Sequence, residues 1–335
     1  MTRWNVPFRT CYNKGKILSN IIIFDMIDSL NMTIDRSDIN ENTDLMGEIG
    51  TRIEIDPYNS NELKVEGKLG NLKVVITEME IKVYGSIAKY LNGDNLETLS
   101  LEKLRDAVKK LENELGVPVH KGKIKRVDLA GTFQMKEKPQ LYLNKLGWLD
   151  NVTRSTFEST TLYYTKKGER QLRFYDKTRE MKRKGQVVNI ANLLRYEYAF
   201  ERKRIRKLFK RDLTVEELQN KEVFNVLLDE WHDVYSSISK IEPTYLDVSF
   251  NSLKSASDWV ILCVCQTDSQ VDVLRALKDV FSCREKRRPG DVSLHDRLKR
   301  NTQKALERGK LFAKPDDRIE ELTALIDECY KKHLI

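Results

Sequence analysis

The sequence predicts an α+β protein in which an antiparallel sheet has helices on one face. Three observations support this class. Short segments of alternating apolar and polar residues follow one another through the first two thirds of the chain, a few helical segments interrupt them, and the last third changes to helical spacing. Side chains alternate between the two faces of a strand but return to one face of a helix every three or four residues. Successive strands with inserted helices are typical of an α+β architecture.

The chain begins with a polar, basic stretch, residues 1–20, which we expect to be a weakly ordered lead-in. Residues 21–35 predict a first strand, and the acidic segment 35–44 predicts a loop. Four alternating segments then predict an antiparallel meander: 51–56, 61–68, 71–79 and 80–85.

Residues 100–116 give the clearest helical pattern, because leucines and a valine recur at spacings of three and four. Ser100 can cap the start of this helix and Gly116 can end it. The segment before it, 86–99, predicts a loop or a short helix. Further along the chain we expect a short helix at 141–146, a strand at 160–165 and a basic turn or helix at 178–185.

Three other strands have a charged face, and the chain is organised around them: 123–133, 170–177 and 193–201. Alternate residues of each strand are apolar, and the opposite face carries acids, bases and a tyrosine. If the strands are neighbours, these groups form a site suited to metal-assisted chemistry on a phosphate. The alternative is that each face is an ordinary solvated one. The residues concerned are Arg126, Asp128, Arg173, Tyr175, Lys177, Arg195 and Glu197.

Beyond residue 201 the period becomes helical. A basic helix is expected at 201–211, and further helices at 215–241, 271–281, 293–308 and 318–332. We therefore divide the chain into the lead-in 1–20, a domain over 21–240 and a mostly α-helical C-terminal region over 241–335.

The charge distribution favours a nucleic-acid partner. The chain has 335 residues and a net charge of +8, and the segment 166–211 contains 17 Lys and Arg against 5 Asp and Glu. Basic strips neutralise phosphates, although a solvated basic helix is the simpler alternative for 201–211. Tyr163, Tyr164 and Phe174 offer aromatic surfaces for unpaired bases. The expected DNA-binding residues are Arg126, Lys166, Lys167, Arg170, Arg173 and Arg195.

Cysteine usage and hydropathy argue against secretion. The five cysteines are odd in number and scattered, which fits a reducing cytoplasm. The longest apolar run, near 21–27, is too short to span a bilayer, so we expect neither a membrane anchor nor a signal peptide.

Five segments resemble the gene II/X family of phage and plasmid replication proteins, in the order seen in that family. They are FDMIDSLNMTI, KVYGSIAKYLNGDNL, RVDLAGTF, TLYYTKKGERQLRFYDKTRE and LLRYEYAFERK. The resemblance covers roughly residues 21–240. It implies initiation of rolling-circle replication by an HUH-like endonuclease fold. A tyrosine of such an initiator attacks a phosphodiester of single-stranded or extruded origin DNA, leaving a 3′-OH and a 5′-phosphotyrosine.

The resemblance also suggests roles for individual residues. The chain lacks the paired histidines of the wider class, so Asp128 and Glu197 would bind the divalent ion, and their oxygens favour Mg²⁺ or Mn²⁺. The third ligand stays open, with His120 as a candidate. Tyr175 is the expected nucleophile, because Arg173 and Lys177 flank it and favour its phenolate. Its competitors are Tyr163, Tyr164 and Tyr196, and Lys177 could instead bind the scissile phosphate.

Two other functions stay open from the sequence. One is a mobilisation relaxase, which uses the same chemistry at a transfer origin. The other is a non-catalytic DNA- or RNA-binding protein in which Asp128 and Glu197 form only salt bridges. Besides origin DNA, a replication initiator is expected to work with a host helicase and polymerase, and it could be a dimer.

Overall fold

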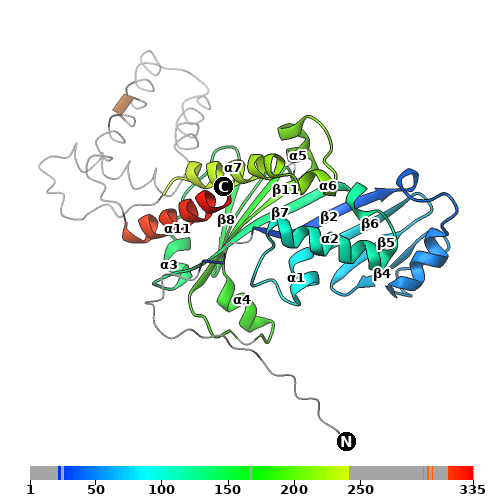
Figure 1. The fold of residues 1–335 in the computed structure, drawn as a ribbon. Coiled ribbons are helices and arrows are strands. Elements are labelled where there is room, and N and C mark those ends of the chain that lie inside the picture. Colours follow the sequence, from blue (N-terminus) through cyan, green and yellow to red (C-terminus); the bar gives the residue numbers. More distant parts are fainter. Residues whose placement is uncertain are drawn as a thin grey trace, which may run out of the picture.

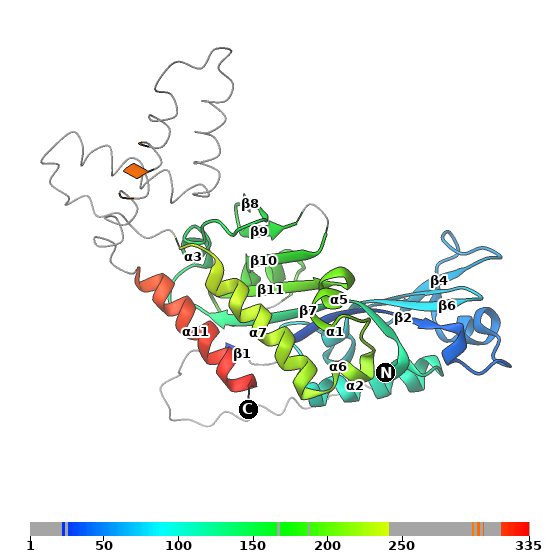
Figure 2. The same ribbon diagram turned by 90° about the horizontal axis from the view of Figure 1, so that it is seen from above.

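The computed structural model describes residues 22–23, 26–165, 168–186, 188–240, 297, 300–301, 304 and 316–334. Its centre is one antiparallel sheet of 11 strands in the order β3-β4-β5-β6-β2-β7-β11-β10-β9-β8, with β1 paired to β7. Figure 2 shows β8, β9, β10, β11, β7 and β2 side by side in this order. The strands are β1 (Ile22–Ile23), β2 (Ile27–Asp35), β3 (Glu54–Ile55), β4 (Val65–Leu69), β5 (Leu72–Ile76), β6 (Glu80–Ser86), β7 (Lys123–Gln134), β8 (Thr153–Phe157), β9 (Thr160–Tyr164), β10 (Arg170–Asp176) and β11 (Leu193–Glu201).

The described helices connect these strands or follow them. They are α1 (Ile87–Asn92), α2 (Leu101–Leu115), α3 (Pro139–Leu143), α4 (Lys177–Arg183), α5 (Arg202–Phe209), α6 (Val215–Leu218), α7 (Lys221–Ser237) and α11 (Asp317–His333). Short η turns lie at Arg36–Asp38, Leu45–Ile49, Gly50–Arg52 and Val119–Lys121. None of the described helices is both long and apolar enough to cross a bilayer.

The apolar face of the central strands packs against α7. Phe174 of β10 and Tyr196 of β11 stack with ring centroids 4.3 Å apart, and Tyr196 stacks in turn on Trp231 of α7 at 4.6 Å. All three side chains are fully buried. Stacked aromatic pairs of this kind add to the free energy of burial. This packing fixes which face of β10 and β11 is turned away from α7.

The last helix, α11, packs beside α7 and also contacts α3 and β7 (Figure 1). The Tyr142 hydroxyl of α3 donates a hydrogen bond to Glu321 of α11 at 2.6 Å, and the Tyr235 hydroxyl of α7 lies 2.9 Å from that of Thr323. Helix α11 confirms the helix predicted at 318–332. The segments 271–281 and most of 293–308 lie outside the described residues, and the domain boundaries stay predictions.

The predicted α+β class is confirmed, and α2 has both of its predicted ends. Ser100 caps its N-terminus by accepting from the Lys103 amide, and Gly116 ends it in the left-handed conformation. Three details of the prediction are wrong. Residues 51–56 form only the two-residue strand β3, which has a strand partner on one side alone. The helix predicted at 215–241 is divided, because Asn220 caps a new helix there. Strand β8 was not predicted.

Candidate active site

Strands β7, β11 and β10 are adjacent, so the three charged segments lie side by side as the sequence predicts. In the antiparallel register Tyr175 lies opposite Arg195, and Glu197 lies opposite both Arg173 and Ala130. Directly opposed residues of neighbouring strands share a face. Tyr175, Arg195 and Glu197 therefore occupy one continuous patch of the sheet, and Asp128 lies on the same face.

Tyr175 is half-buried, and its hydroxyl donates a hydrogen bond to Glu197 Oε1 at 2.6 Å. Burial raises the pKa of this phenol well above its usual value near 10. The Arg195 guanidinium acts in the opposite direction, and the Glu197 carboxylate raises the pKa further. The expectation that flanking cations would favour the phenolate is therefore wrong. In this structure the Tyr175 hydroxyl instead donates its hydrogen bond to a carboxylate.

Arg195 is fully buried and connects the groups around it. Its Nε lies 2.9 Å from Glu197 Oε1, and its Nη2 lies 3.1 Å from Asp28 Oδ1. Its Nη1 donates to the Asn95 carbonyl at 2.6 Å and to Thr132 Oγ1 at 3.3 Å. Burial alone would lower the pKa of Arg195, but Asp28, Tyr175 and Glu197 outweigh it and raise the pKa. The side chain is an internal cation, which corrects the expectation that it contacts DNA.

Asp28 is part of this site, and the sequence reading missed it. It lies on β2 at a register shift between Ile27 and Ser29, which is a β-bulge or similar irregularity. Its carboxylate accepts hydrogen bonds from Ser86 at 3.1 Å and from Ser29 at 3.2 Å, besides pairing with Arg195. The available signal was an acid inside the apolar segment that forms the first strand. Buried acids of this kind are rare unless they are paired.

Asp128 and Arg126, both on β7, form a salt bridge. Arg126 Nε and Nη2 reach the two Asp128 oxygens at 2.6 and 2.8 Å, which is a bidentate arrangement. Arg126 Nη1 also lies 3.4 Å from Glu201. Burial raises the pKa of Asp128 to about 6; the Arg126 pair opposes this, and the charges of Glu197 and Asp28 add to it. Asp128 is therefore electrostatically coupled to the other two carboxylates of the site.

Lys177 differs most from its predicted placement. It begins α4, with Asp176 as the N-cap, so it does not continue the alternation of β10. Its side chain is fully buried; Nζ donates to Asn95 Oδ1 at 3.0 Å and lies 2.8 Å from Glu180 Oε2. Nζ is also 5.9 Å from the centroid of the Tyr175 ring. Lys177 would have to leave these partners before it could bind a phosphate.

The remaining predicted DNA-binding residues are spread over both faces. Arg173 is half-buried beside the site and donates to Gln171 at 3.2 Å. Arg170 lies opposite Phe200, so it shares the face of α7 and not that of Tyr175. Lys166 and Lys167 lie outside the described residues. The structure therefore brings Arg126, Arg173 and Arg195 to the site but not Arg170.

The other tyrosines considered as the nucleophile lie on different faces of the sheet. Tyr163 and Tyr196 are fully buried on the apolar side, and their hydroxyls donate to the backbone carbonyls of Gly147 and Trp231. Tyr164 is half-buried and lies opposite Gln171, on the same face as Tyr175. The expectation that Tyr163 and Phe174 offer stacking surfaces is wrong, because both are buried. Of the three aromatic residues, only Tyr164 remains a candidate for stacking on an unpaired base.

The carboxylates as they are paired here do not fit a divalent ion. Both oxygens of Asp128 are held by Arg126, and Glu197 Oε1 is held by Tyr175 and Arg195. Among the described residues no three His, Cys, Asp or Glu side chains are arranged to hold a metal. His120 pairs with Glu112 of α2 and is not part of this site. The described residues thus contain no preformed ligand set for the Mg²⁺ or Mn²⁺ that the sequence predicts.

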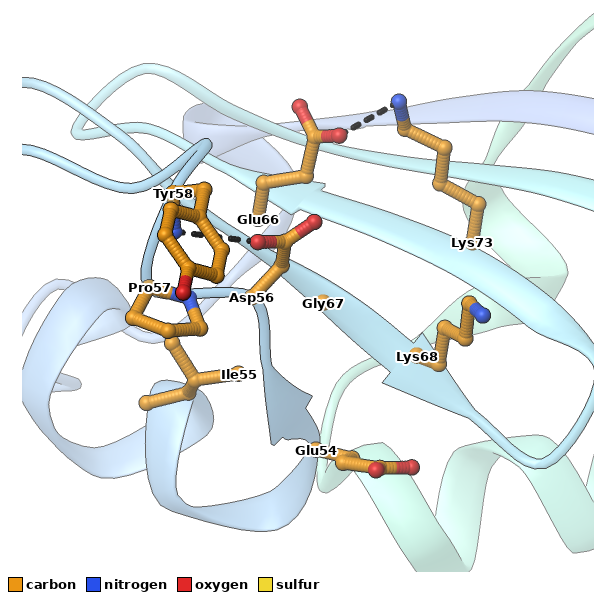
Figure 3. Close-up of a pocket in the computed structure, with 9 residues that line it drawn as sticks. All are labelled: Glu54, Ile55, Asp56, Pro57, Tyr58, Glu66, Gly67, Lys68 and Lys73. Carbon is orange, nitrogen blue, oxygen red and sulfur yellow. Dashed lines mark hydrogen bonds and ion pairs between the residues drawn. The ribbon is translucent and has the colours of Figure 1, made fainter.

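A pocket of about 300 Å³ lies elsewhere, along β3, β4 and β5 (Figure 3). Glu66 and Lys73 form an ion pair at 2.5 Å on its wall, and the Tyr58 ring stands at its rim with 95% of its surface exposed. Strands β6, β2 and β7 separate this pocket from the strands that carry Tyr175 and Glu197. It is therefore distinct from the candidate active site.

A match to a protein family covers most of the sheet and all of the candidate site. The family model, described as the N-terminal part of a replication-associated protein of the gene II type, matches residues 26–226, more than half of the chain. One solved structure with some likeness is that of a rolling circle replication initiator protein from Geobacillus stearothermophilus. Its TM-score is 0.33 at 12% identity, over 67% of this chain and 88% of that chain. Among curated proteins the comparison gave no match.

Proposed function

The chain belongs to the family of replication-associated gene II proteins, the rolling-circle initiators that its sequence resembles, and we propose that it nicks and rejoins single-stranded origin DNA through Tyr175. The observation that supports this most strongly is the hydrogen bond from the Tyr175 hydroxyl to Glu197 at 2.6 Å. Of the tyrosines weighed as nucleophile, Tyr175 alone donates to a carboxylate on the face away from α7. Nucleophilic hydroxyls in enzymes are placed within hydrogen-bond reach of a base in this way.

The proposed reaction is a transesterification. The Tyr175 oxygen attacks the scissile phosphorus, its O–H bond breaks and a tyrosyl–phosphorus bond forms. The bond from phosphorus to the 3′ oxygen breaks, and that oxygen takes up a proton to become the 3′-OH. The protein then holds a 5′-phosphotyrosine. Because the new ester conserves the phosphodiester linkage, the reverse reaction can rejoin the strand without ATP.

Positive charge around the site is supplied by Arg126, Arg173 and Arg195. Arginine suits phosphate recognition because its planar guanidinium presents several donors. Arg126 and Arg173 are partly exposed, so we assign the flanking phosphates to them, whereas Arg195 is internal. Host helicase and polymerase, a dimeric state and the metal requirement stay predictions of this function.

The test is an adduct assay with Tyr175→Phe. Labelled single-stranded oligonucleotides that tile the origin of the chain's own replicon are incubated with protein and Mn²⁺, and a denaturation-resistant protein–DNA band is measured. The wild type should form the band and Tyr175→Phe should not, because a phenyl ring has no oxygen to attack with. DNA binding measured without cleavage should be retained.

Tyr164→Phe is the matched control, because Tyr164 shares the face of Tyr175 and lies on the neighbouring strand. It should form the adduct at the wild-type rate. If the band persists in Tyr175→Phe and disappears in Tyr164→Phe, the nucleophile is misassigned. Tight binding by the wild type with no band on any origin oligonucleotide would instead support the non-catalytic function.

A further inference from the structure

Glu197 is placed to receive the proton that Tyr175 must lose. The distance from the phenolic oxygen to Glu197 Oε1 is 2.6 Å, within the range for a proton donor and its acceptor. The backbone defines this geometry, because Tyr175 lies opposite Arg195 and Glu197 follows two residues along the same face of β11. Glu197 is also nearly fully buried, so water does not compete strongly for its oxygen.

The Glu197 carboxylate is fixed by a buried chain of charges. Arg195 Nε contacts the same oxygen at 2.9 Å, and Arg195 Nη2 contacts Asp28 at 3.1 Å. Asp28 is fixed in turn by the hydroxyls of Ser86 and Ser29. The Arg195 guanidinium thus lies between Asp28 and Glu197, within ion-pair distance of both. The arrangement is a carboxylate–arginine–carboxylate row that ends at the Tyr175 hydroxyl.

We propose that Glu197 is the general base of the nicking step and that Asp28 and Arg195 are positioning residues that hold it against Tyr175. This inference rests on the proposed function. The Tyr175 proton moves to Glu197 Oε1 as the tyrosyl–phosphorus bond forms, the electron pair of the broken bond stays on the 3′ oxygen, and that oxygen takes a proton from water. Rejoining reverses these transfers, with Glu197 returning its proton to Tyr175.

The role differs from the metal ligand that the family resemblance implies for Glu197. Tyr175 and Arg195 both contact Glu197 Oε1, and a general base uses the contact with Tyr175 as it stands. The charged and titratable groups that face Glu197 come from four strands: Tyr175 and Arg173 of β10, Arg195 of β11, Asp128 and Arg126 of β7, and Asp28 of β2. Lys177 and Glu180 of α4 face Tyr175 and Arg195 from the other side.

The experiment measures the rate of adduct formation against pH and against Mn²⁺ concentration. The wild-type rate should rise tenfold per pH unit on the acid side and then level off, because the base must be ionised. Glu197→Gln should lower the rate about 10²- to 10⁴-fold, which is the usual contribution of a general base, and should remove the rise of the rate with pH on the acid side. The Mn²⁺ concentration for half-maximal rate should not change.

Asp28→Asn tests the positioning role. Removing this carboxylate takes away one of the two acids that Arg195 contacts, so Arg195 no longer holds Glu197 in place against Tyr175. The rate at saturating oligonucleotide should fall, and the oligonucleotide concentration for half-maximal rate should stay unchanged. A purely structural role for Asp28 would weaken oligonucleotide binding and lower the thermal midpoint together with the rate. Glu201→Gln is the matched control, since Glu201 lies on the same face of β11 but pairs with Arg126, and it should change neither quantity.

Three results would overturn the inference: a wild-type rate that does not depend on pH on the acid side, a wild-type rate in Glu197→Gln, or a defect in Glu197→Gln that excess Mn²⁺ restores. The pH profile of the wild type needs no variant, so a folding defect in Glu197→Gln cannot hide the answer. If the wild-type adduct forms at Tyr175 but any of these three contradicting results is obtained, the assignment of Glu197 as the base fails and the nicking function stands. If no adduct forms, the proposed function itself fails.

Discussion

The two faces of β10 and β11 carry tyrosines in opposite settings. On the side of α7, Tyr196 lies between Phe174 and Trp231, and its hydroxyl donates to a backbone carbonyl at 2.9 Å. On the other side, Tyr175 lies among charged groups and donates to a carboxylate. Tyr196 is fully buried, whereas Tyr175 is half-buried and lies beside the fully buried Arg195.

Tyr196 thus stabilises the fold, whereas Tyr175 is placed to react. A backbone carbonyl in a helix cannot take a proton, so the hydrogen bond of Tyr196 contributes only to stability. A carboxylate can take one, so the hydrogen bond of Tyr175 is also a possible proton path. Burial of charge is costly unless the charge is paired, and Arg195 lies within ion-pair distance of both Asp28 and Glu197.

The largest stability effect is expected on the apolar side, from Trp231→Ala. Among the described residues Trp231 is the largest fully buried side chain, and it stacks on Tyr196. Truncating a buried aromatic residue costs about 3–5 kcal/mol of the free energy of unfolding, which chemical denaturation would measure. Val226→Ala, at an exposed position of the same helix, should change stability by less than about 0.5 kcal/mol. Equal losses in the two variants would contradict the packing described here.

A smaller, pH-dependent effect is expected on the charged side, from Asp128→Asn. An unfolded Asp128 ionises near pH 4, whereas burial raises its pKa to about 6 in the folded protein. The folded state therefore binds more protons in this window, so stability falls as pH rises from 4 to 6. The shift corresponds to roughly 3 kcal/mol. Asp128→Asn should remove this slope in denaturation curves recorded from pH 4 to 6.

Asp212→Asn provides the opposite control for that slope. Its hydrogen bond with Arg202 lowers the pKa of Asp212, despite partial burial. Its contribution to stability is therefore present above pH 4 and is lost as pH falls further. If Asp128→Asn leaves the slope between pH 4 and 6 unchanged, Asp128 does not hold a proton there.

The smallest effect is expected from Tyr196→Phe, which removes one hydroxyl and keeps the stacked ring. The loss should be about 1 kcal/mol of unfolding free energy, the usual value for one neutral hydrogen bond. Adduct formation should keep the wild-type rate, because Tyr196 lies on the apolar face. A slower adduct at unchanged stability would mean that the two faces are not independent.

The alternation of residues along the strands was enough to predict the central arrangement. It placed Tyr175, Arg195, Glu197 and Asp128 on one face, and the register confirms this. The same rule assigns Arg170 to the opposite face, with Leu172 and Phe174, although the charge of the segment had suggested a DNA contact. Charge alone therefore overestimated the size of the site.

Two features depended on structure that alternation does not encode. Asp28 reaches Arg195 from β2, where a register shift interrupts the alternation. Lys177 leaves the strand pattern because Asp176 caps a helix at that point, accepting from the Arg179 amide. Asp176 is a favourable N-cap residue, so the helix start was detectable from sequence. The buried ion pair between Asp28 and Arg195 was not, because it joins strands far apart in the chain.

The most direct test of the central claim is to identify the residue that carries the DNA. The wild-type adduct with an origin oligonucleotide is digested with protease and nuclease, and the modified peptide is sequenced by mass spectrometry. A nucleotide on Tyr175, in the peptide containing Phe174 and Asp176, is the predicted result. A nucleotide on Tyr164, or on a tyrosine of the apolar face, would contradict the assignment of the charged face as the active site.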